Sequence, residues 1–407
     1  MRLLVLGGTE FVGRAVVEAA CARGWEVTVL HRGRHRPPAG VGGRERAPPP
    51  PPRPPPPAPP TRPRDGGVGT RWGAPPGARG GWGAPAPPGA RPPRGGGGGP
   101  PPAPPTAPDG LAALAADTGT WDVVVDTWSA APRAVLEAAR LLHGRAGRYV
   151  YVSSRSVYTW PWPSVDGPAG AGEPVEGAAA DAEATDYPRD KHGGELAAAG
   201  TFGERDSLLV RAGLILGPHE NIGRLPWWLT RIARGGPVLA PGPRELAVSF
   251  IDARDLADWI LAAAGQRLSG PYDLAGPPGH TTMGELLDAC VRVTGADAEL
   301  RWTDPEVIAD AGIEPWTGLP VWVPPGAELY SPAHRADVSR ALATGLECRP
   351  AEETVADTWR WLTGIGGVAP LRPDRPPVGL DPEVEAAVLA GPGGVPGTTP
   401  EEGASGQ

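Results

Sequence analysis

The sequence begins MRLLVLGGTEFVG (residues 1–13), and this stretch decides the fold. A short apolar run over residues 2–6 ends at Gly7, and apolar residues then recur at helical spacing over residues 11–23. Residues 26–30 alternate between polar and apolar side chains and are rich in valine. These patterns predict a strand, a glycine-rich turn, a helix and a second strand, which together form the first half of a dinucleotide-binding unit.

The same alternation of strands and helices continues downstream. Strands are expected at residues 121–127, 148–154 and 207–213, with helices at residues 131–143 and 187–199. We therefore expect an α/β fold with a doubly wound, Rossmann-like parallel sheet and a smaller C-terminal substrate lobe. The expected division is a dinucleotide-binding domain over residues 1–36 and 109–218, a low-complexity insert over 37–108, a substrate lobe mixed with sheet completion over 219–360, and a peripheral tail over 361–407.

The expected insert is dominated by Pro, Gly, Ala and Arg, with runs of four or more prolines and of five glycines. Such a stretch cannot bury enough apolar surface to offset its ordering entropy, so we expect disorder over residues 37–108. No strand pattern stands where the third strand of the sheet belongs. The stretch is either an inserted linker or, as a hypothesis, GC-rich DNA read out of frame.

Composition narrows the class of protein. A formal net charge of -8 and a pI near 5.5 oppose nucleic-acid binding, which needs clustered positive charge. Neither the three cysteines nor the seven histidines show the spacing of a metal site. The N-terminus lacks a signal peptide's apolar run, and no segment approaches the ~20 apolar residues of a membrane span. We expect a cytoplasmic protein with a small-molecule substrate and with no metal, membrane or nucleic-acid partner.

The glycine-rich turn predicts a phosphate site. Gly7 permits the tight turn, Gly8 or Thr9 presents backbone to a pyrophosphate, and Gly13 lets the helix pack closely on the strand. Glu10 is unfavourable beside a phosphate unless its carboxylate points to solvent. An ordinary strand-to-helix turn is the alternative interpretation. The cofactor-binding residues expected in this turn are Gly7, Gly8, Thr9, Phe11, Val12 and Gly13.

The end of the second predicted strand bears on the choice of cofactor. An NAD-specific site normally places an acidic residue there, on the ribose hydroxyls, whereas this chain has His31 and Arg32. A cation suits the 2′-phosphate of NADP. We therefore expect NADP, with NAD as the alternative; the other interpretation of His31 and Arg32 is a solvated basic turn.

The sole lysine of the chain, Lys191, stands four residues after Tyr187, which puts both side chains on one face of a helix. Arginine replaces lysine everywhere else, as a GC-biased gene would do. A lysine that survives such bias calls for a chemical explanation, because only its ammonium is a compact donor with a readily shifted pKa. A solvated Tyr and Lys pair is the alternative.

The glycine run and the Tyr-x-x-x-Lys pair resemble those of extended or atypical short-chain dehydrogenase/reductases, a family that includes NAD-dependent epimerases and dehydratases. The resemblance implies that Tyr187 is the general acid/base and that Lys191 supports it and binds the nicotinamide ribose. It selects Ser154 as the hydroxyl that binds the substrate oxygen, with Ser153 as the alternative and a strand-end cap as the structural interpretation. It also implies that Thr127 lines the cofactor and that the chain forms a homodimer.

The resemblance further bears on the reaction. Related sugar dehydratases carry an Asp-Glu pair where this chain has Arg155 and Ser156, which argues against dehydration. We expect an NAD(P)-dependent oxidoreductase acting on a small carbonyl or alcohol through Ser154, Tyr187 and Lys191. The alternatives are an NAD-dependent sugar epimerase and a non-catalytic cofactor-sensing or RNA-associated binding protein. Asn221, the sole asparagine, either reaches a substrate phosphate or occupies a turn.

Overall fold

The computed structural model describes residues 1–31, 42–45, 111–116, 118–128, 131–167 and 172–391. Most of the predicted insert therefore lies outside the described residues, as does Arg32.

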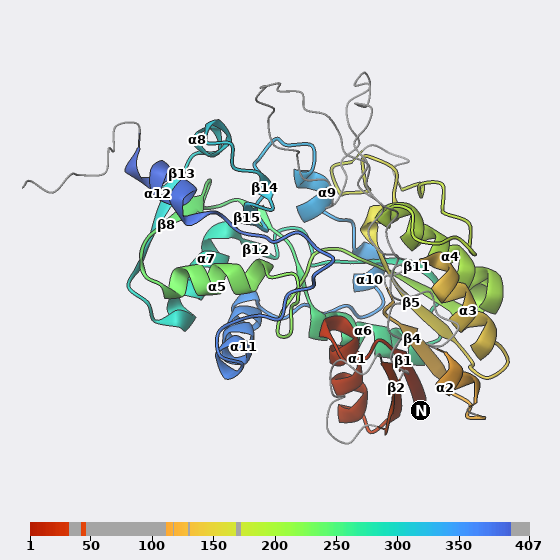
Figure 1. Cartoon of the computed structure of the whole chain (residues 1–407). Coiled ribbons are helices and arrows are strands. Elements are labelled where there is room, and N and C mark those ends of the chain that lie inside the picture. Colours follow the sequence, from red (N-terminus) through yellow and green to blue (C-terminus); the bar gives the residue numbers. More distant parts are fainter. Residues whose placement is uncertain (32–41, 46–110, 117, 129–130, 168–171, 392–407) are drawn as a thin grey trace, which may run out of the picture.

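A seven-stranded parallel sheet forms the centre of the first domain, with the strand order β11-β6-β5-β4-β1-β2-β3 (Figure 1). This order, in which the chain starts in the middle and winds outward both ways, confirms the predicted Rossmann-like doubly wound sheet. The strands are β1 (Arg2–Leu6), β2 (Glu26–His31), β3 (Gly42–Glu45), β4 (Val123–Asp126), β5 (Tyr149–Ser154), β6 (Ser207–Ala212) and β11 (Gly270–Leu274).

Strand β3 lies inside the stretch that was expected to be disordered and to hold no strand. Its backbone pairs with β2 from Thr28 opposite Gly42 to His31 opposite Glu45. The expectation was wrong for these four residues. Strand pairing uses backbone groups, so an edge strand with the sequence Gly-Gly-Arg-Glu forms without the apolar pattern on which the prediction relied.

Helices cover both faces of the sheet because side chains of each strand alternate between them. Leu3 and Val5 of β1 face one hydrophobic core, and Leu4 and Leu6 face the other. Helices α1 (Phe11–Ala22) and α6 (Ala253–Gly265) pack together on the first face. Helices α2 (Ala112–Ala115), α3 (Pro132–Leu142) and α4 (Tyr187–Phe202) cover the second.

The substrate lobe has its own hydrophobic core and lies beside the sheet domain (Figure 1). Two buried tryptophans, Trp228 and Trp322, donate their indole N–H groups to the carbonyls of Pro320 and Gly242.

No helix in the described parts of the chain is both long and apolar enough to cross a membrane. The helices of the lobe are α5 (Arg224–Ala233), α7 (Met283–Thr294), α8 (Pro305–Asp310), α9 (Tyr330–His334), α11 (Ala351–Gly364) and α12 (Pro382–Ala390). Helix α10 (Ser339–Leu342) instead packs on β11 of the sheet domain. The strands of the lobe are β7 (Ile215–Leu216), β8 (Gly236–Pro241), β9 (Ala247–Val248), β10 (Ile251–Asp252), β12 (Thr281–Thr282), β13 (Ala298–Thr303), β14 (Pro315–Trp316) and β15 (Leu319–Pro320).

The described part of the predicted tail is folded against the lobe rather than peripheral to it. The buried carboxylate of Glu385 in α12 accepts hydrogen bonds from Arg231 of α5 at 2.5 Å and from the backbone N–H of Leu239 in β8 at 3.0 Å. The dark-blue segment before α12 bends toward the sheet domain (Figure 1). Proline and glycine in this stretch suggested a loose end, but the tertiary contacts of one glutamate fix it in place.

Candidate functional site

The glycine-rich turn between β1 and α1 is packed too tightly for any larger residue. Gly7 has φ = 89°, and its N–H donates to the carbonyl of Leu30 at 3.0 Å. A Cβ atom at Gly13 would lie 2.3 Å from the carbonyl oxygen of Gly7. At Gly8 it would lie 2.9 Å from side-chain atoms of Val17 and Val29. The turn therefore brings the start of α1 against the end of β1, as a dinucleotide cradle requires.

The N-terminus of α1 keeps its backbone donors available. Glu10 occupies the cap position, but its side chain makes no capping hydrogen bond. Instead, its carboxylate accepts a hydrogen bond from the amide of Asn221 at 3.2 Å. The first-turn N–H groups of α1 can therefore serve an anion, and these residues fit the pyrophosphate of a nicotinamide nucleotide. Thr9, Phe11 and Val12 lie in this same turn and first helical turn.

Two polar residues end β4 beside this cradle. The hydroxyl of Thr127 donates to the carbonyl of Leu6 at 2.9 Å, so it ties β4 to the glycine turn. Asp126 is fully buried and accepts hydrogen bonds from the hydroxyl of Tyr149 at 2.6 Å and from the N–H of Trp128 at 2.8 Å. Burial raises the pKa of Asp126 to about 6, and both hydrogen bonds and the positive charge of Lys191 act against this rise.

The predicted hydroxyl lies at the end of β5. The Ser154 hydroxyl oxygen accepts hydrogen bonds from the backbone N–H of Ser156 at 3.2 Å and from its hydroxyl at 3.0 Å. It thus caps the short 3₁₀ turn Arg155–Val157, and its own proton remains to be donated elsewhere. Ser153, the alternative, has a buried hydroxyl with no hydrogen-bond partner among the described residues.

Helix α4 begins at Tyr187 and carries Lys191 one turn later. The carboxylate of Asp186 caps the helix by accepting from the N–H of Arg189 at 3.2 Å, and Pro188 stands in the first turn, where it costs no hydrogen bond. The Lys191 ammonium is buried and donates to the carbonyls of Val152 at 2.8 Å and Trp128 at 3.2 Å.

The electrostatics of Lys191 differ from those of a surface lysine. Burial lowers the pKa of its ammonium to about 8, against the opposing charge of Asp126. The positive charges of Arg372 and Arg375 lower this pKa further. Lys191 also lies 4.8 Å from the ring centre of Tyr151. The solvated Tyr and Lys alternative is therefore wrong for Lys191, because the helix turns its ammonium into the sheet edge.

Three arginines that sequence reasoning did not single out lie around Tyr187. The guanidinium of Arg375 stacks over the ring of Tyr187, 4.8 Å from its centre. The backbone N–H of Arg372 donates to the carbonyl of Asn221 at 3.0 Å. Arg224 begins helix α5, where the buried carboxylate of Glu220 accepts from its backbone N–H at 2.8 Å. No local signal marks these arginines, since the sequence is rich in arginine throughout.

Arg155 and Ser156 stand where related dehydratases carry acidic residues, and Arg155 has a structural role. Its buried guanidinium donates to the carboxylate of Asp273 at 3.1 Å and to the carbonyls of Pro332 at 2.5 Å and of Pro163. All of these partners are protein groups, so the Arg155 side chain joins the end of β5 to β11 and to α9.

Of the two residues expected to distinguish NADP from NAD, the structure describes His31 but not Arg32. His31 is buried at the end of β2, beside the glycine turn. Arg32 lies outside the described residues, so the geometry of the 2′-phosphate prediction stays a prediction.

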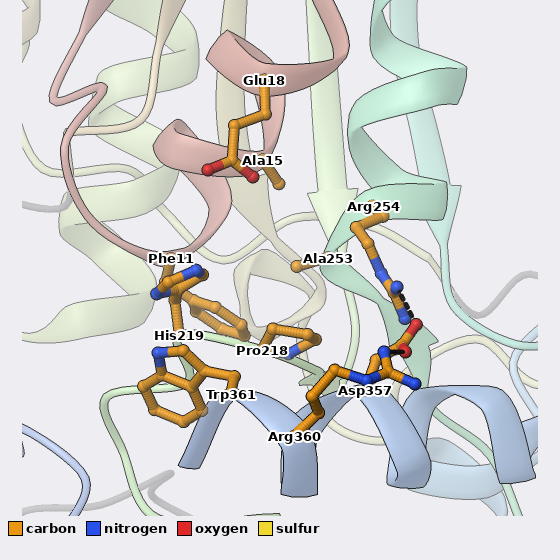
Figure 2. A pocket seen from close by; sticks show the side chains of 10 residues that line it. All are labelled: Phe11, Ala15, Glu18, Pro218, His219, Ala253, Arg254, Asp357, Arg360 and Trp361. Atoms are coloured by element: carbon orange, nitrogen blue, oxygen red, sulfur yellow. Dashed lines mark hydrogen bonds and ion pairs between the residues drawn. The ribbon is translucent and has the colours of Figure 1, made fainter. Parts of the chain in front are cut away.

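A cavity of about 340 Å³ opens where the first turns of α1 meet the lobe (Figure 2). Its wall includes the Arg254–Asp357 ion pair, with Arg360 also bound to Asp357. The rings of His219 and Trp361 lie 5.1 Å apart, and burial followed by the charge of Arg14 lowers the pKa of His219 to about 4. The lining residues are Phe11, Ala15, Glu18, Pro218, His219, Ala253, Arg254, Asp357, Arg360 and Trp361. Ser154, Tyr187 and Lys191 are not among them.

The comparisons with known proteins agree with this fold. Residues 107–274 match the model of the NAD dependent epimerase/dehydratase family. No curated protein matches the sequence. Among solved structures, the enzyme WbmH of Bordetella bronchiseptica, in complex with NAD⁺, is similar at a TM-score of 0.54 and 15% identity, over 90% of this chain and 99% of that one.

Two further structures share the fold. The UDP-glucuronic acid 4-epimerase of Bacillus cereus, in complex with NAD, has a TM-score of 0.51 and 13% identity, over 90% of this chain and 99% of that one. TunA, an NAD-dependent NDP-hexosamine 5,6-dehydratase of tunicamycin biosynthesis, has a TM-score of 0.51 and 16% identity, over 89% and 98%. Residues 107–274 therefore match the NAD dependent epimerase/dehydratase family, and the doubly wound sheet has the fold of these solved structures.

Proposed function

We propose that this chain is an oxidoreductase that interconverts an alcohol and a carbonyl, with Ser154, Tyr187 and Lys191 as its catalytic residues and a nicotinamide nucleotide as cofactor. The observation that carries the proposal is the placement of Lys191. The only ammonium side chain of the sequence is buried on α4, where it donates to the carbonyls of Val152 and Trp128 at the ends of β5 and β4. Parallel α/β folds bind their ligands at this edge of the sheet.

Each residue has a distinct part in the proposed reaction. The Ser154 hydroxyl donates a hydrogen bond to the substrate oxygen, while the Tyr187 hydroxyl gives that oxygen a proton or takes one from it. Lys191 holds positive charge beside the tyrosine and offers a donor to the cofactor ribose. The glycine turn and the N-terminus of α1 hold the pyrophosphate. When bound, the nicotinamide supplies or accepts the hydride.

The proposal also covers the choice between NADP and NAD and the binding of the pyrophosphate. Arg32, next to His31, offers a positive charge in place of an acidic ribose ligand, which favours NADP over NAD. The Glu10 carboxylate accepts from the amide of Asn221 and does not cap α1, so it leaves the first-turn N–H groups to the pyrophosphate.

A sugar epimerase that returns the hydride to the same carbon is the second candidate. It is favoured by the family match and by the activity of the Bacillus cereus neighbour, a UDP-glucuronic acid 4-epimerase. The proposed residues serve both reactions. An epimerase retains its nucleotide through purification and needs none added, whereas the oxidoreductase consumes added NADPH or NADH.

The proposal is tested by calorimetric titration of the full-length protein with NADPH and, separately, NADH, followed by a screen of carbonyl substrates. We expect binding that prefers NADPH and weakens in Arg32→Ala, and turnover that falls by about 10²-fold or more in Tyr187→Phe while binding persists. Tyr272→Phe is the matched control, because Tyr272 is buried against Trp259, away from Tyr187. Absence of binding to either nucleotide would refute the proposal.

A further inference from the structure

The segment between α11 and α12 crosses the lobe next to Tyr187, and we name residues 371–380 the C-terminal strap. It is tied down along its length. The N–H of Arg372 donates to the carbonyl of Asn221 at 3.0 Å, and the N–H of Gly379 donates to that of Thr317 at 2.7 Å. A Cβ atom at Gly379 would lie 2.0 Å from the indole nitrogen of Trp227, so the backbone lies directly on that ring. The strap is therefore a built part of the site.

The strap places Arg375 against the proposed proton-transfer residue. Its guanidinium lies 4.8 Å from the ring centre of Tyr187. The buried Arg224, from α5, lies nearby and contacts the ring of Trp316 at 5.6 Å. Burial lowers the pKa of Arg224; the charge of Glu220 opposes this, and the positive charge of Arg375 adds to it. Two like charges are thus held close together in a partly water-excluded place.

These two guanidinium groups lack the carboxylate partners that two other buried arginines have. Arg155 pairs with Asp273, and Arg211 pairs with Glu195. Arg148, at the opposite end of β5, has no carboxylate partner but donates to two backbone carbonyls. By contrast, Arg224 is 9% exposed, yet its buried Nε atom has no hydrogen-bond partner, and the same holds for Nε of Arg375. Neither guanidinium makes an ion pair with a described carboxylate.

Leaving a buried charged donor unsatisfied is costly, so such groups mark a place that a ligand completes. Arginine donors match the planar, bidentate geometry of carboxylates and phosphates. Glu220 makes no ion pair with the guanidinium of Arg224, because its two carboxylate oxygens accept from the backbone N–H groups of Arg224 and Leu225.

We infer that Arg224 and Arg375 form an oxyanion-binding site that holds a carboxylate or phosphate group of the substrate beside Tyr187. The inference rests on the proposed function for the identity of the reacting group. It names the substrate class: a hydroxy or keto compound whose anionic group stands within a few atoms of the carbon that is oxidised or reduced. Arg375 reaches this place only because the strap lies over the lobe, outside the region that matches the family.

The test is calorimetric titration of the full-length protein, without nucleotide, with inorganic phosphate and separately with malonate as the carboxylate probe. We expect a single site for at least one probe, and affinity about tenfold lower or worse in Arg375→Gln, since a charge-assisted hydrogen bond is lost. Arg224→Gln should weaken binding as much, and Arg375→Lys should restore part of it. The better-bound probe tells phosphate from carboxylate.

Arg340→Gln is the matched control, because Arg340 also stacks on a tyrosine, 4.0 Å from the ring centre of Tyr272, but far from the site. It should bind both probes as the wild type does. Absence of binding of either probe to the wild type, or equal weakening by Arg340→Gln and Arg375→Gln, would overturn the inference. Arg375 is only half-buried, so its variant remains informative if Arg224→Gln fails to fold. The titration needs neither cofactor nor turnover, so its failure is distinct from a failure of the proposed oxidoreductase, and Tyr187→Phe should retain anion binding.

Discussion

At the scale of single residues, the glycine turn shows how a missing side chain shapes a site. A methyl group at Gly13 would meet the carbonyl oxygen of Gly7 at 2.3 Å, so helix α1 would have to move away from β1. We expect Gly13→Ala to lower the free energy of unfolding by about 1–3 kcal/mol and to weaken nucleotide binding, as overpacking of a rigid core does. Urea unfolding and nucleotide titration measure the two effects.

Gly200 provides the opposite case, at an exposed position near the end of helix α4. No atom lies within 4 Å of a Cβ built there, so Gly200→Ala should raise the free energy of unfolding by about 0.5–1 kcal/mol through the lower entropy of the unfolded chain. If both alanine variants shift stability in the same direction, close packing at Gly13 is not what excludes a side chain.

A buried carboxyl makes stability depend on pH. Burial raises the pKa of Asp126 from its usual 3.8 to about 6, so between these values the folded protein binds more protons than the unfolded chain, and the free energy of unfolding falls as the pH rises. Asp126→Asn keeps a polar partner for Tyr149 and Trp128 without the charge. We expect the variant to gain about 3 kcal/mol relative to the wild type between pH 4 and pH 7.

Chemical unfolding across this pH range measures the gain. Asp258→Asn is the control, because Asp258 is an exposed partner of Arg23 at 2.8 Å and should leave the pH profile unchanged. A constant difference between Asp126→Asn and the wild type at all pH values would show that Asp126 does not titrate in this window.

At the scale of elements, helix α12 anchors the C-terminal strap through one side chain. Removing the buried carboxylate of Glu385 leaves Arg231 and the N–H of Leu239 without their acceptor. We expect Glu385→Ala to lower the free energy of unfolding by about 3 kcal/mol and to speed amide exchange in residues 371–390, which hydrogen–deuterium exchange detects. Glu383→Ala, on the exposed side of the same helix, should change neither quantity appreciably.

Weaker anion binding and faster amide exchange should appear together in Glu385→Ala, because Arg375 reaches Tyr187 only while the strap is held. Exchange at wild-type rates over residues 371–390 would mean that α12 is secured by its apolar contacts alone.

Elements are also the scale at which the sequence was most informative. Strand β1 has the bounds that its pattern predicts, and helix α3 differs from its predicted range of 131–143 by one residue at each end, because the apolar pattern reflects burial directly. Strand β3 was missed, because its pairing depends on the backbone of β2 and leaves no pattern in its own side chains.

At the scale of the whole molecule, the site forms where two separate hydrophobic cores meet. The sheet domain supplies the glycine turn, Ser154, Tyr187 and Lys191, all on elements around the cores of the sheet. The lobe and the strap supply Arg224 and Arg375, which depend on a different core. Under the proposed function, substrate and cofactor bind between these two cores. The ion pair of Arg254 with Asp357 joins the two parts at the cavity of Figure 2.

Local spacing in the sequence was enough to predict the doubly wound sheet, the glycine turn, the resemblance to the family, and the placement of Tyr187 and Lys191 on one helix face. Only the tertiary structure decided that Lys191 is buried against Val152 and Trp128, and that Glu10 is engaged by Asn221. The placement of the arginines around Tyr187 also depends on tertiary packing, since Arg375 stands 188 positions from the tyrosine that it contacts. Such contacts depend on how distant segments pack, and short-range patterns carry no information about that packing.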